Sequence, residues 1–209
     1  MNMPLRLHED RLFPADAGVR SIARTLYAEV AELPIISPHG HTDPEWFATN
    51  EPFGNATELL LHPDHYLFRM LYSQGIALED LGISGSGANP RESWRLLAEN
   101  YHLFRATPSR IWLDWVFASA FDIEVSLDAS TSDFYFDTIT EKLQQDGFRP
   151  RALFDRYGLE VLATTESPLD TLAHHQAIRE SGWGGKVITA YRPDPIVDPE
   201  FEGFADNLV

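Results

Sequence analysis

Residues 34–43 read Pro-Ile-Ile-Ser-Pro-His-Gly-His-Thr-Asp, a short apolar run followed by two histidines that a single glycine separates. The run Leu33 to Ser37 has the length and apolar character of a buried parallel strand. The preceding stretch, Ser21 to Glu32, has helical spacing that places four apolar residues on one side: Ile22, Leu26, Val30 and Leu33. A helix followed by a buried strand suggests an α/β fold.

Two further strand-like runs occur late in the chain. Leu159 to Thr165 is followed by an amphipathic helix from Leu169 to Ser181, and Lys186 to Asp194 reads as the next strand. A strand, a helix and a strand at this spacing form a βαβ unit, which implies a parallel sheet with right-handed crossovers. We expect the strand at 33–37 to join that sheet.

The long segment between these strands, residues 43–157, looks almost wholly helical. Its expected helices begin near Pro63-Asp64 and then cover Glu92–Phe104, Ile111–Phe121 and Ser132–Gln145, with a flexible loop at 83–90. We expect Trp112, Trp115 and Phe117 to lie in the core. The segment therefore reads as a large helical insertion into the sheet domain.

Composition limits the class of protein. The 209 residues are 44% hydrophobic and 12% aromatic, which fits a folded globular chain with a sizeable core. There are no cysteines, so disulfides and thiolate metal sites are excluded. The N-terminus lacks the apolar stretch of a signal peptide, and no long uncharged apolar run suggests a membrane span. We expect a cytoplasmic protein without a membrane partner.

The formal net charge is −16, from 16 basic and 32 acidic side chains. This balance argues against binding to nucleic acid, which depends on clustered lysine and arginine. It also disfavours the approach of an anionic ligand, although salt screens that repulsion beyond about 8 Å. If the ligand is an acid, a local arginine or a metal must therefore reverse the field in the site.

His39 and His41 are candidate metal ligands. On an extended backbone, side chains two residues apart point the same way, about 6.6 Å apart along the chain. Two imidazoles placed so can share one cation, and Gly40 between them lets backbone or ligand come close. The alternative is a turn that holds two histidines by coincidence. Their position at the carboxyl end of a parallel strand, where open sheets and barrels bind ligands, favours the metal.

Polar residues also end the two later strands. Arg192 could grip a carboxylate with its forked guanidinium, or it could pair with Asp194 or Glu166. The hydroxyls of Thr164 and Thr165 could bind a sugar, or they could cap the following helix. Both alternatives stay open at this point.

His65 and Tyr66 follow the expected helix start at Pro63-Asp64. Consecutive helical residues point about 100° apart, so the two could face one ligand only at a helix start or turn. The alternative is an ordinary amphipathic helix with a surface histidine and a half-buried tyrosine. His62 and His102 show no ligand spacing. His174 and His175 fall in an expected helix away from the strand ends, and we interpret them as structural.

Four motifs together resemble the uronate isomerase (glucuronate isomerase) family of the amidohydrolase superfamily, which are metal-binding TIM barrels. They are Leu33-Pro-Ile-Ile-Ser-Pro-His-Gly-His-Thr-Asp-Pro, Asp64-His-Tyr-Leu-Phe-Arg-Met, Ala163-Thr-Thr-Glu and Ala190-Tyr-Arg-Pro-Asp. The motifs occur in the order of the family, and the resemblance runs from near the N-terminus to about Asp198. One motif alone would be weak, whereas the ordered set is specific.

The resemblance implies interconversion of D-glucuronate with D-fructuronate, and of D-galacturonate with D-tagaturonate. A proton would move between C2 and C1 through an ene-diol. The family's His-x-His corresponds to His39 and His41, which would hold a divalent metal, usually zinc. His65 and Tyr66 would reach the active site, where Tyr66 could stabilise oxyanion charge. Arg192 would face the substrate and most plausibly hold its carboxylate, and Thr165 is a further candidate for substrate binding.

The chain departs from the family in length. A (β/α)₈ barrel takes about 250 residues, whereas only three strands are expected here, and family members continue past residue 209 with further metal ligands. We therefore expect the N-terminal part of a TIM barrel: residues 1–42 form the first helix and strand, 43–157 the helical insertion and 158–209 a continuing βαβ unit.

Two rival functions are a metal-dependent hydrolase of the same superfamily and a truncated, non-catalytic relic. The sequence does not determine the oligomeric state, and a homo-oligomer is among the alternatives.

Overall fold

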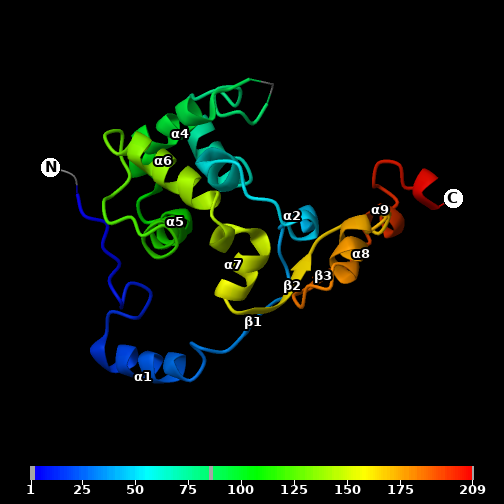
Figure 1. Ribbon diagram of the computed structural model, residues 1–209, viewed down its shortest axis with the longest axis horizontal. Helices are drawn as coiled ribbons and strands as arrows, with labels where there is room; N and C mark the ends of the chain where they lie inside the picture. The colour runs from blue at the N-terminus through cyan, green and yellow to red at the C-terminus, as the bar shows by residue number, and fades with distance from the viewer. Residues whose placement is uncertain (1–2, 85–86, 209) are drawn as a thin grey trace. The chain divides into compact units, whose positions relative to one another are not determined.

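The computed structural model describes residues 3–84 and 87–208 (Figure 1). The chain divides into two compact units, each made of two separate stretches of sequence. Residues 1–25 and 52–148 form the first unit, and residues 26–51 and 149–209 form the second. The loop expected at 83–90 lies partly outside the described residues, which stop at Ser84 and resume at Gly87.

The first unit is helical. Its α-helices are α3 (His65–Tyr72), α4 (Pro90–Glu99), α5 (Pro108–Ser119) and α6 (Ser132–Leu143). A π-helical turn at Thr57–Leu61 precedes α3, a 3₁₀ turn at Tyr101–Phe104 lies between α4 and α5, and another 3₁₀ turn at Asp146–Phe148 follows α6. Helix α1 (Ala17–Ala28) begins in this unit and ends in the second.

Side-chain caps mark the starts of α3, α4 and α5. Asp64 Oδ1 accepts hydrogen bonds from the backbone N–H of Tyr66 at 2.8 Å and of Leu67 at 3.3 Å. Asn89 and Thr107 cap α4 and α5 in the same way, and a proline follows each of them. Proline is favoured at the first helical position because its missing N–H would have no partner there. The expected helix start at Pro63-Asp64 is therefore confirmed.

The core of the first unit is built around aromatic rings that meet edge to face. The Phe117 ring meets Trp94 and Tyr135 edge to face, with centroid separations of 6.3 Å and 4.9 Å. All three side chains are fully buried. The placement of Trp112 and Trp115 in the core was wrong, because they are 38% and 37% exposed. Helix α5 is apolar on more than one side, and the side it buries contains Phe117.

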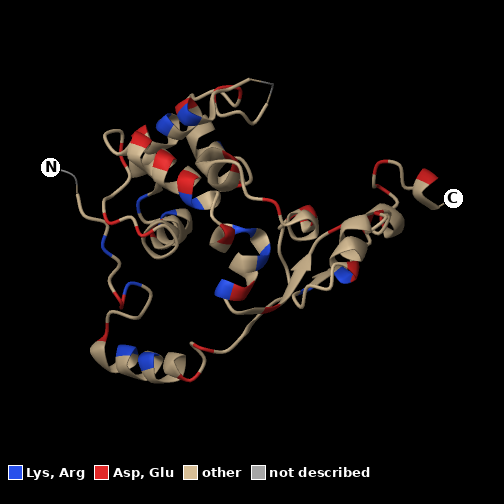
Figure 2. Cartoon of the chain, viewed as in Figure 1, with Lys and Arg blue, Asp and Glu red and all other residues tan. Residues whose placement is uncertain are grey.

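Basic and acidic residues both occur on α4 and α6 (Figure 2), and several of them form ion pairs between the two helices. Arg95 donates to both carboxylate oxygens of Asp133 at 3.0 Å, and Arg91 donates to Asp133 and Asp137. The hydrogen bond from Arg95 lowers the pKa of Asp133 below its usual range. The paired side chains are accessible to solvent, so these ion pairs contribute little to the free energy of unfolding.

The second unit contains a three-stranded parallel sheet in the order β1-β2-β3. Its strands are β1 (Ile35–Ser37), β2 (Leu159–Thr164) and β3 (Lys186–Thr189). Helix α8 (Ala173–Glu180) lies between β2 and β3 in the chain. The expected parallel sheet, the βαβ unit and the membership of the first strand are thus confirmed.

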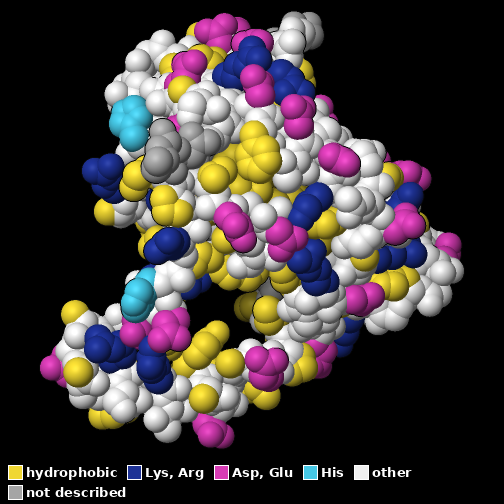
Figure 3. Space-filling model, turned by 60° about the vertical axis from the view of Figure 1, so that its left-hand side comes forward, with side chains coloured by type: hydrophobic (Ala, Val, Ile, Leu, Met, Phe, Trp, Pro, Cys, Tyr) yellow, Lys and Arg dark blue, Asp and Glu magenta, His cyan; other side chains and the backbone are white. Residues whose placement is uncertain are grey.

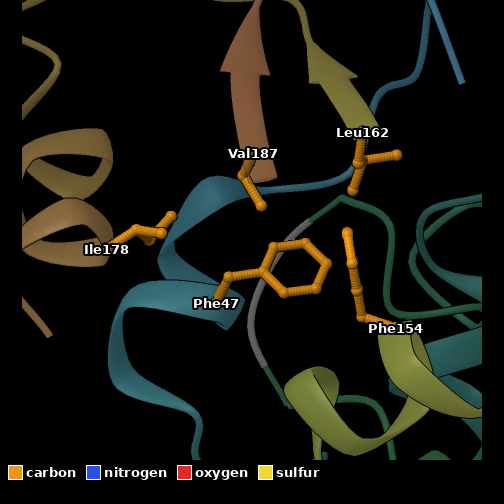
Figure 4. Close-up of a cluster of buried hydrophobic side chains, with 5 residues drawn as sticks. All are labelled: Phe47, Phe154, Leu162, Ile178 and Val187. Atoms are coloured by element: carbon orange, nitrogen blue, oxygen red, sulfur yellow. The ribbon is translucent and has the colours of Figure 1, made fainter. Parts of the chain in front are cut away.

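Helices α2 (Pro44–Thr49), α7 (Pro150–Arg156) and α8 pack against this sheet, and a short helix α9 (Asp194–Val197) follows β3. Figure 4 shows the resulting apolar cluster, to which α2, α7, β2, α8 and β3 each contribute one side chain: Phe47, Phe154, Leu162, Ile178 and Val187. Trp183 extends the cluster, because its ring stacks on Phe47 at 5.8 Å and 5°.

Several element boundaries differ from the expected ones. Helix α1 begins and ends four residues earlier than expected, α8 begins four residues later, and β3 stops at Thr189. The expectation that the first strand is buried was wrong, because Ile35 and Ile36 are 49% and 62% exposed. Among the residues described, strand β1 pairs only with β2, so its other edge has no neighbouring strand.

Other apolar side chains are also exposed. Helix α1 has no buried residue, and its apolar Ile22 and Leu26 are 63% and 66% exposed. Figure 3 shows such hydrophobic side chains beside charged ones on the face that it presents. Within residues 3–84 and 87–208, no helix is long and apolar enough to span a membrane.

We expect Phe47→Ala to lower the free energy of unfolding of the second unit by about 3–5 kcal/mol, because it leaves a cavity among α2, α7 and the sheet. Phe201→Ala provides the control, since Phe201 is 40% exposed and its truncation should cost about 1 kcal/mol or less. Hydrogen exchange of the β2 amides under native conditions measures both values. Equal protection in the two variants would contradict the role of Phe47.

Candidate active site

His39 and His41 lie just beyond the carboxyl end of β1, and both are exposed. Their Nε2 atoms are 3.1 Å apart, and their ring centroids are separated by 5.1 Å. The two imidazoles therefore converge on one point, as their spacing in the sequence predicts. A separation of 3.1 Å also permits a hydrogen bond between one N–H and the lone pair of the other ring.

The backbone around these histidines is held from both sides. A Cβ atom at Gly40 would lie 3.3 Å from the carbonyl oxygen of Ala163, a tight contact that glycine avoids where this loop approaches β2. Asp43 then caps α2, because its Oδ1 accepts a hydrogen bond from the backbone N–H of Glu45 at 2.8 Å. The strand before and the capped helix after the histidines fix the course of the loop.

The histidine pair fits a divalent cation. Two nitrogens bound to one tetrahedral zinc at about 2.0–2.1 Å lie about 3.3 Å apart, close to the separation seen here. Neutral imidazole is also a preferred zinc ligand. Over the described part of the chain, no group of three or more histidine, cysteine, aspartate or glutamate side chains could hold a metal. The described residues therefore bring together two imidazole nitrogens, one fewer than the three protein ligands of a typical catalytic zinc site.

A pocket of about 360 Å³ opens beside His41, at the carboxyl ends of the strands. It contains three histidines and three carboxylates, together with hydroxyl groups, and no lysine or arginine. Its lining residues are His41, Thr42, Asp43, Pro44, Thr165, Glu166, Asp170, His174 and His175. Its volume is within the range of small-molecule sites.

A buried hydrogen-bond network lies behind this pocket. Thr164 Oγ1 is 2.6 Å from Glu166 Oε2 and 2.9 Å from His175 Nε2. Thr164 and His175 are fully or almost fully buried. The assignment of His174 and His175 to a helix away from the strand ends was therefore wrong. The later start of α8 brings its first turn back to the carboxyl end of β2.

The alternative role of the threonines as helix caps is also wrong. Helix α8 follows Leu172, which adopts a left-handed conformation with φ of 55°, and it has no side-chain cap. The Thr164 hydroxyl is directed into the sheet end instead. The sequence signal for this network was the alternation along the strand, because Thr164 and Glu166 are two residues apart and can share one side.

Arg192 and Thr165 line a second pocket of about 410 Å³, together with Ser167, Asp194, Pro195, Asp198 and Phe201. Within the described ranges, no carboxylate lies close enough to form an ion pair with Arg192, so the alternative pairing with Asp194 or Glu166 is not observed. The exposed guanidinium is thus available to a ligand. Thr165 lines this pocket and the one beside His41.

His65 and Tyr66 form the first turn of α3 in the helical unit. Their rings lie side by side, with centroids 4.2 Å apart and planes tilted by 35°. The Tyr66 side chain is 65% exposed, more than the half-buried tyrosine of an ordinary amphipathic helix. Buried Leu67 and Leu71 anchor the opposite side of α3, so the helix presents the two rings to the outside of its unit.

Comparison with known proteins gives a consistent result. The sequence profile of the glucuronate isomerase family matches residues 17–209. A uronate isomerase from Sphingopyxis alaskensis is 69% identical over 212 aligned residues, which are 100% of this chain and 45% of that protein. A uronate isomerase from Phenylobacterium zucineum is 62% identical over 100% of this chain and 44% of that protein.

Solved structures agree with the sequence comparison. The crystal structure of glucuronate isomerase from Caulobacter crescentus matches with a TM-score of 0.93 and 60% identity, covering 97% of this chain and 43% of that one. Uronate isomerase from Thermotoga maritima matches with a TM-score of 0.83 and 28% identity over the same shares. The chain thus spans less than half the length of these relatives.

Proposed function

The chain belongs to the glucuronate isomerase family, and from this membership we propose that its protein is a uronate isomerase. It would interconvert D-glucuronate with D-fructuronate, and D-galacturonate with D-tagaturonate. The observation that carries the proposal is the identity of 69% with a uronate isomerase over the full length of this chain. All four motifs that suggested the family lie within the matched residues 17–209.

We propose that the sheet forms the first three strands of a (β/α)₈ barrel. Its strands are parallel and adjacent in chain order, and a helix connects β2 to β3, as in such barrels. The candidate residues His39, His41, Thr165 and Arg192 all follow strands at their carboxyl ends, where barrel enzymes place their active sites.

His39 and His41 would hold a divalent cation, zinc by the chemistry of imidazole ligands. The bound metal would supply a Lewis acid that polarises an oxygen of the substrate. Their 3.1 Å separation supports this role, and further ligands would come from beyond the residues described.

The other candidate residues would bind and stabilise the substrate. Arg192, free of any ion pair in the described ranges, would hold the carboxylate of the sugar acid with its guanidinium. The Thr165 hydroxyl would donate a hydrogen bond to the bound sugar or accept one from it. Tyr66, with His65 beside it, would donate to the oxygen on which negative charge develops as the proton leaves C2 for C1. The family resemblance supports this last role.

We expect the protein, purified in the form in which the cell makes it, to convert D-glucuronate to D-fructuronate. Tyr66→Ala should lower kcat by about 10²- to 10³-fold, because it removes a donor to the developing oxyanion. Tyr72→Ala is the matched control, since Tyr72 ends the same helix and is 60% exposed. Detection of the keto acid by chromatography gives both rates.

An unchanged kcat in the Tyr66 variant would remove that residue from the mechanism. Release of a hydrolysis product in place of a keto sugar acid would replace the isomerase with a metal-dependent hydrolase.

For the metal, we expect His39→Ala and His41→Ala each to weaken zinc binding by about 10-fold or more, since each removes one of two ligands. His102→Ala should leave the affinity unchanged, because His102 is exposed in the helical unit. Isothermal titration calorimetry with zinc measures the dissociation constants. Equal affinities in all three variants would show that the histidine pair is not the metal site.

Arg192→Ala should raise KM for D-glucuronate by about 10- to 100-fold with little change in kcat, because it removes charged hydrogen bonds made equally to substrate and transition state. Arg192→Lys keeps the positive charge but loses the forked N–H donors of the guanidinium. Its KM should therefore lie between that of Arg192→Ala and that of the unaltered protein. A fall in kcat at constant KM would instead place Arg192 at the reacting carbons.

A further inference from the structure

We propose that Glu166 binds a hydroxyl of the sugar acid, and that Thr164 and His175 are positioning residues that hold its carboxylate. The inference rests on the proposed function, because it assigns a second contact to the same substrate. The sequence motifs assigned no role in substrate binding to Glu166, which was considered only as a possible ion-pair partner of Arg192.

Glu166 is buried more deeply than a solvated surface carboxylate. Its side chain is only 13% exposed, and it lines the pocket that also contains His41 and Thr165. Its backbone N–H lies 3.4 Å from Thr189 Oγ1, which ties the end of β2 to the end of β3. A carboxylate with so little exposed surface needs hydrogen-bond donors for its oxygens.

Thr164 supplies one such donor. Its Oγ1 lies 2.6 Å from Glu166 Oε2, a distance typical of a hydroxyl that donates to a carboxylate. The same oxygen is 3.0 Å from the carbonyl of Ile188 and 2.9 Å from His175 Nε2. A hydroxyl has a single proton to donate. Glu166 Oε2 is nearer to it than the Ile188 carbonyl oxygen and belongs to a carboxylate, so it is the stronger acceptor.

The surroundings of His175 indicate which of its nitrogens carries the proton. Nδ1 is buried and has no hydrogen-bond partner within the described part of the chain, so a proton there would leave a buried donor unsatisfied. The proton therefore belongs on Nε2, which donates to Thr164 Oγ1. The donors then run in one direction, from His175 through Thr164 to Glu166, and they fix the position of Oε2.

Glu166 Oε1 has no hydrogen-bond partner among residues 3–84 and 87–208. An ionised carboxylate can only accept hydrogen bonds, and it repels other anions. The group that occupies this position must therefore be a donor, such as a sugar hydroxyl, and not the carboxylate of the substrate.

The neighbouring pocket provides the complementary group. Arg192 lies in it, and Thr165 lines both pockets. A polyhydroxy acid that extends past Thr165 can thus place its carboxylate at Arg192 and a hydroxyl at Glu166. This arrangement selects the chemical class, because a simple carboxylic acid would satisfy only Arg192.

Ligand binding to the same purified protein tests the inference, with D-glucuronate and hexanoate, a six-carbon acid without hydroxyls, as probes. Glu166→Ala and Thr164→Val should raise the dissociation constant of D-glucuronate by about 10- to 100-fold. Both should leave that of hexanoate within about 2-fold. Glu160→Ala is the control, since Glu160 is exposed on the same strand. NMR titration gives all of these constants.

Conservative variants separate positioning from folding. Thr164→Ser keeps the hydroxyl and should restore D-glucuronate affinity, whereas valine keeps only the shape. His175→Gln keeps a donor near the position of Nε2 and should bind D-glucuronate more tightly than His175→Leu. A failure of both rescues would overturn the positioning roles.

The remaining outcomes are distinct. If the unaltered protein does not bind D-glucuronate, the proposed function fails, and this inference fails with it. If it binds, and the Glu166 and Thr164 variants bind equally well, the inference alone is overturned. Equal weakening for D-glucuronate and hexanoate would also overturn it, because such a loss reports damage to the whole site.

Discussion

The parallel pairing of β1 with β2 is the interaction on which the candidate site depends. It joins Ile36 to Val161 across a chain separation that contains residues 52–148, the longer of the two stretches that form the helical unit. This pairing brings the loop of His39 and His41 to the strand that ends in Thr164. Without it, the histidine pair and the Thr164 network would lie on separate segments, and the pocket beside His41 would not form.

The parts of the fold that could be predicted are those that local sequence determines. The apolar runs predicted all three strands, and a strand, a helix and a strand in close succession required parallel pairing. The convergence of His39 and His41 followed from alternation along an extended backbone. For the strands and for the histidine pair, the local sequence is enough to determine the local geometry.

The errors came from features that depend on distant parts of the chain. Whether Trp112 or Phe117 is buried depends on which side of α5 meets its neighbours, and a helix with several apolar sides does not determine this. The start of α8 depends on the backbone at Leu172, a residue with no evident preference for a left-handed conformation. The role of His175 could not be predicted for the same reason, because a shift of one helical turn decides where it lies.

The interrupted sequence of the sheet unit has a consequence for folding during synthesis. Strand β1 leaves the ribosome about 120 residues before its partner β2. The helical unit, whose elements are mostly local in sequence, can fold in that interval. Once folded, it replaces a long flexible loop with a structured one and changes the entropy of closing β1 onto β2. Until β2 is made, Ile35 and Ile36 belong to an unpaired strand that could recruit other chains. The speed of translation through residues 52–148 therefore affects how long the nascent protein is open to misassembly.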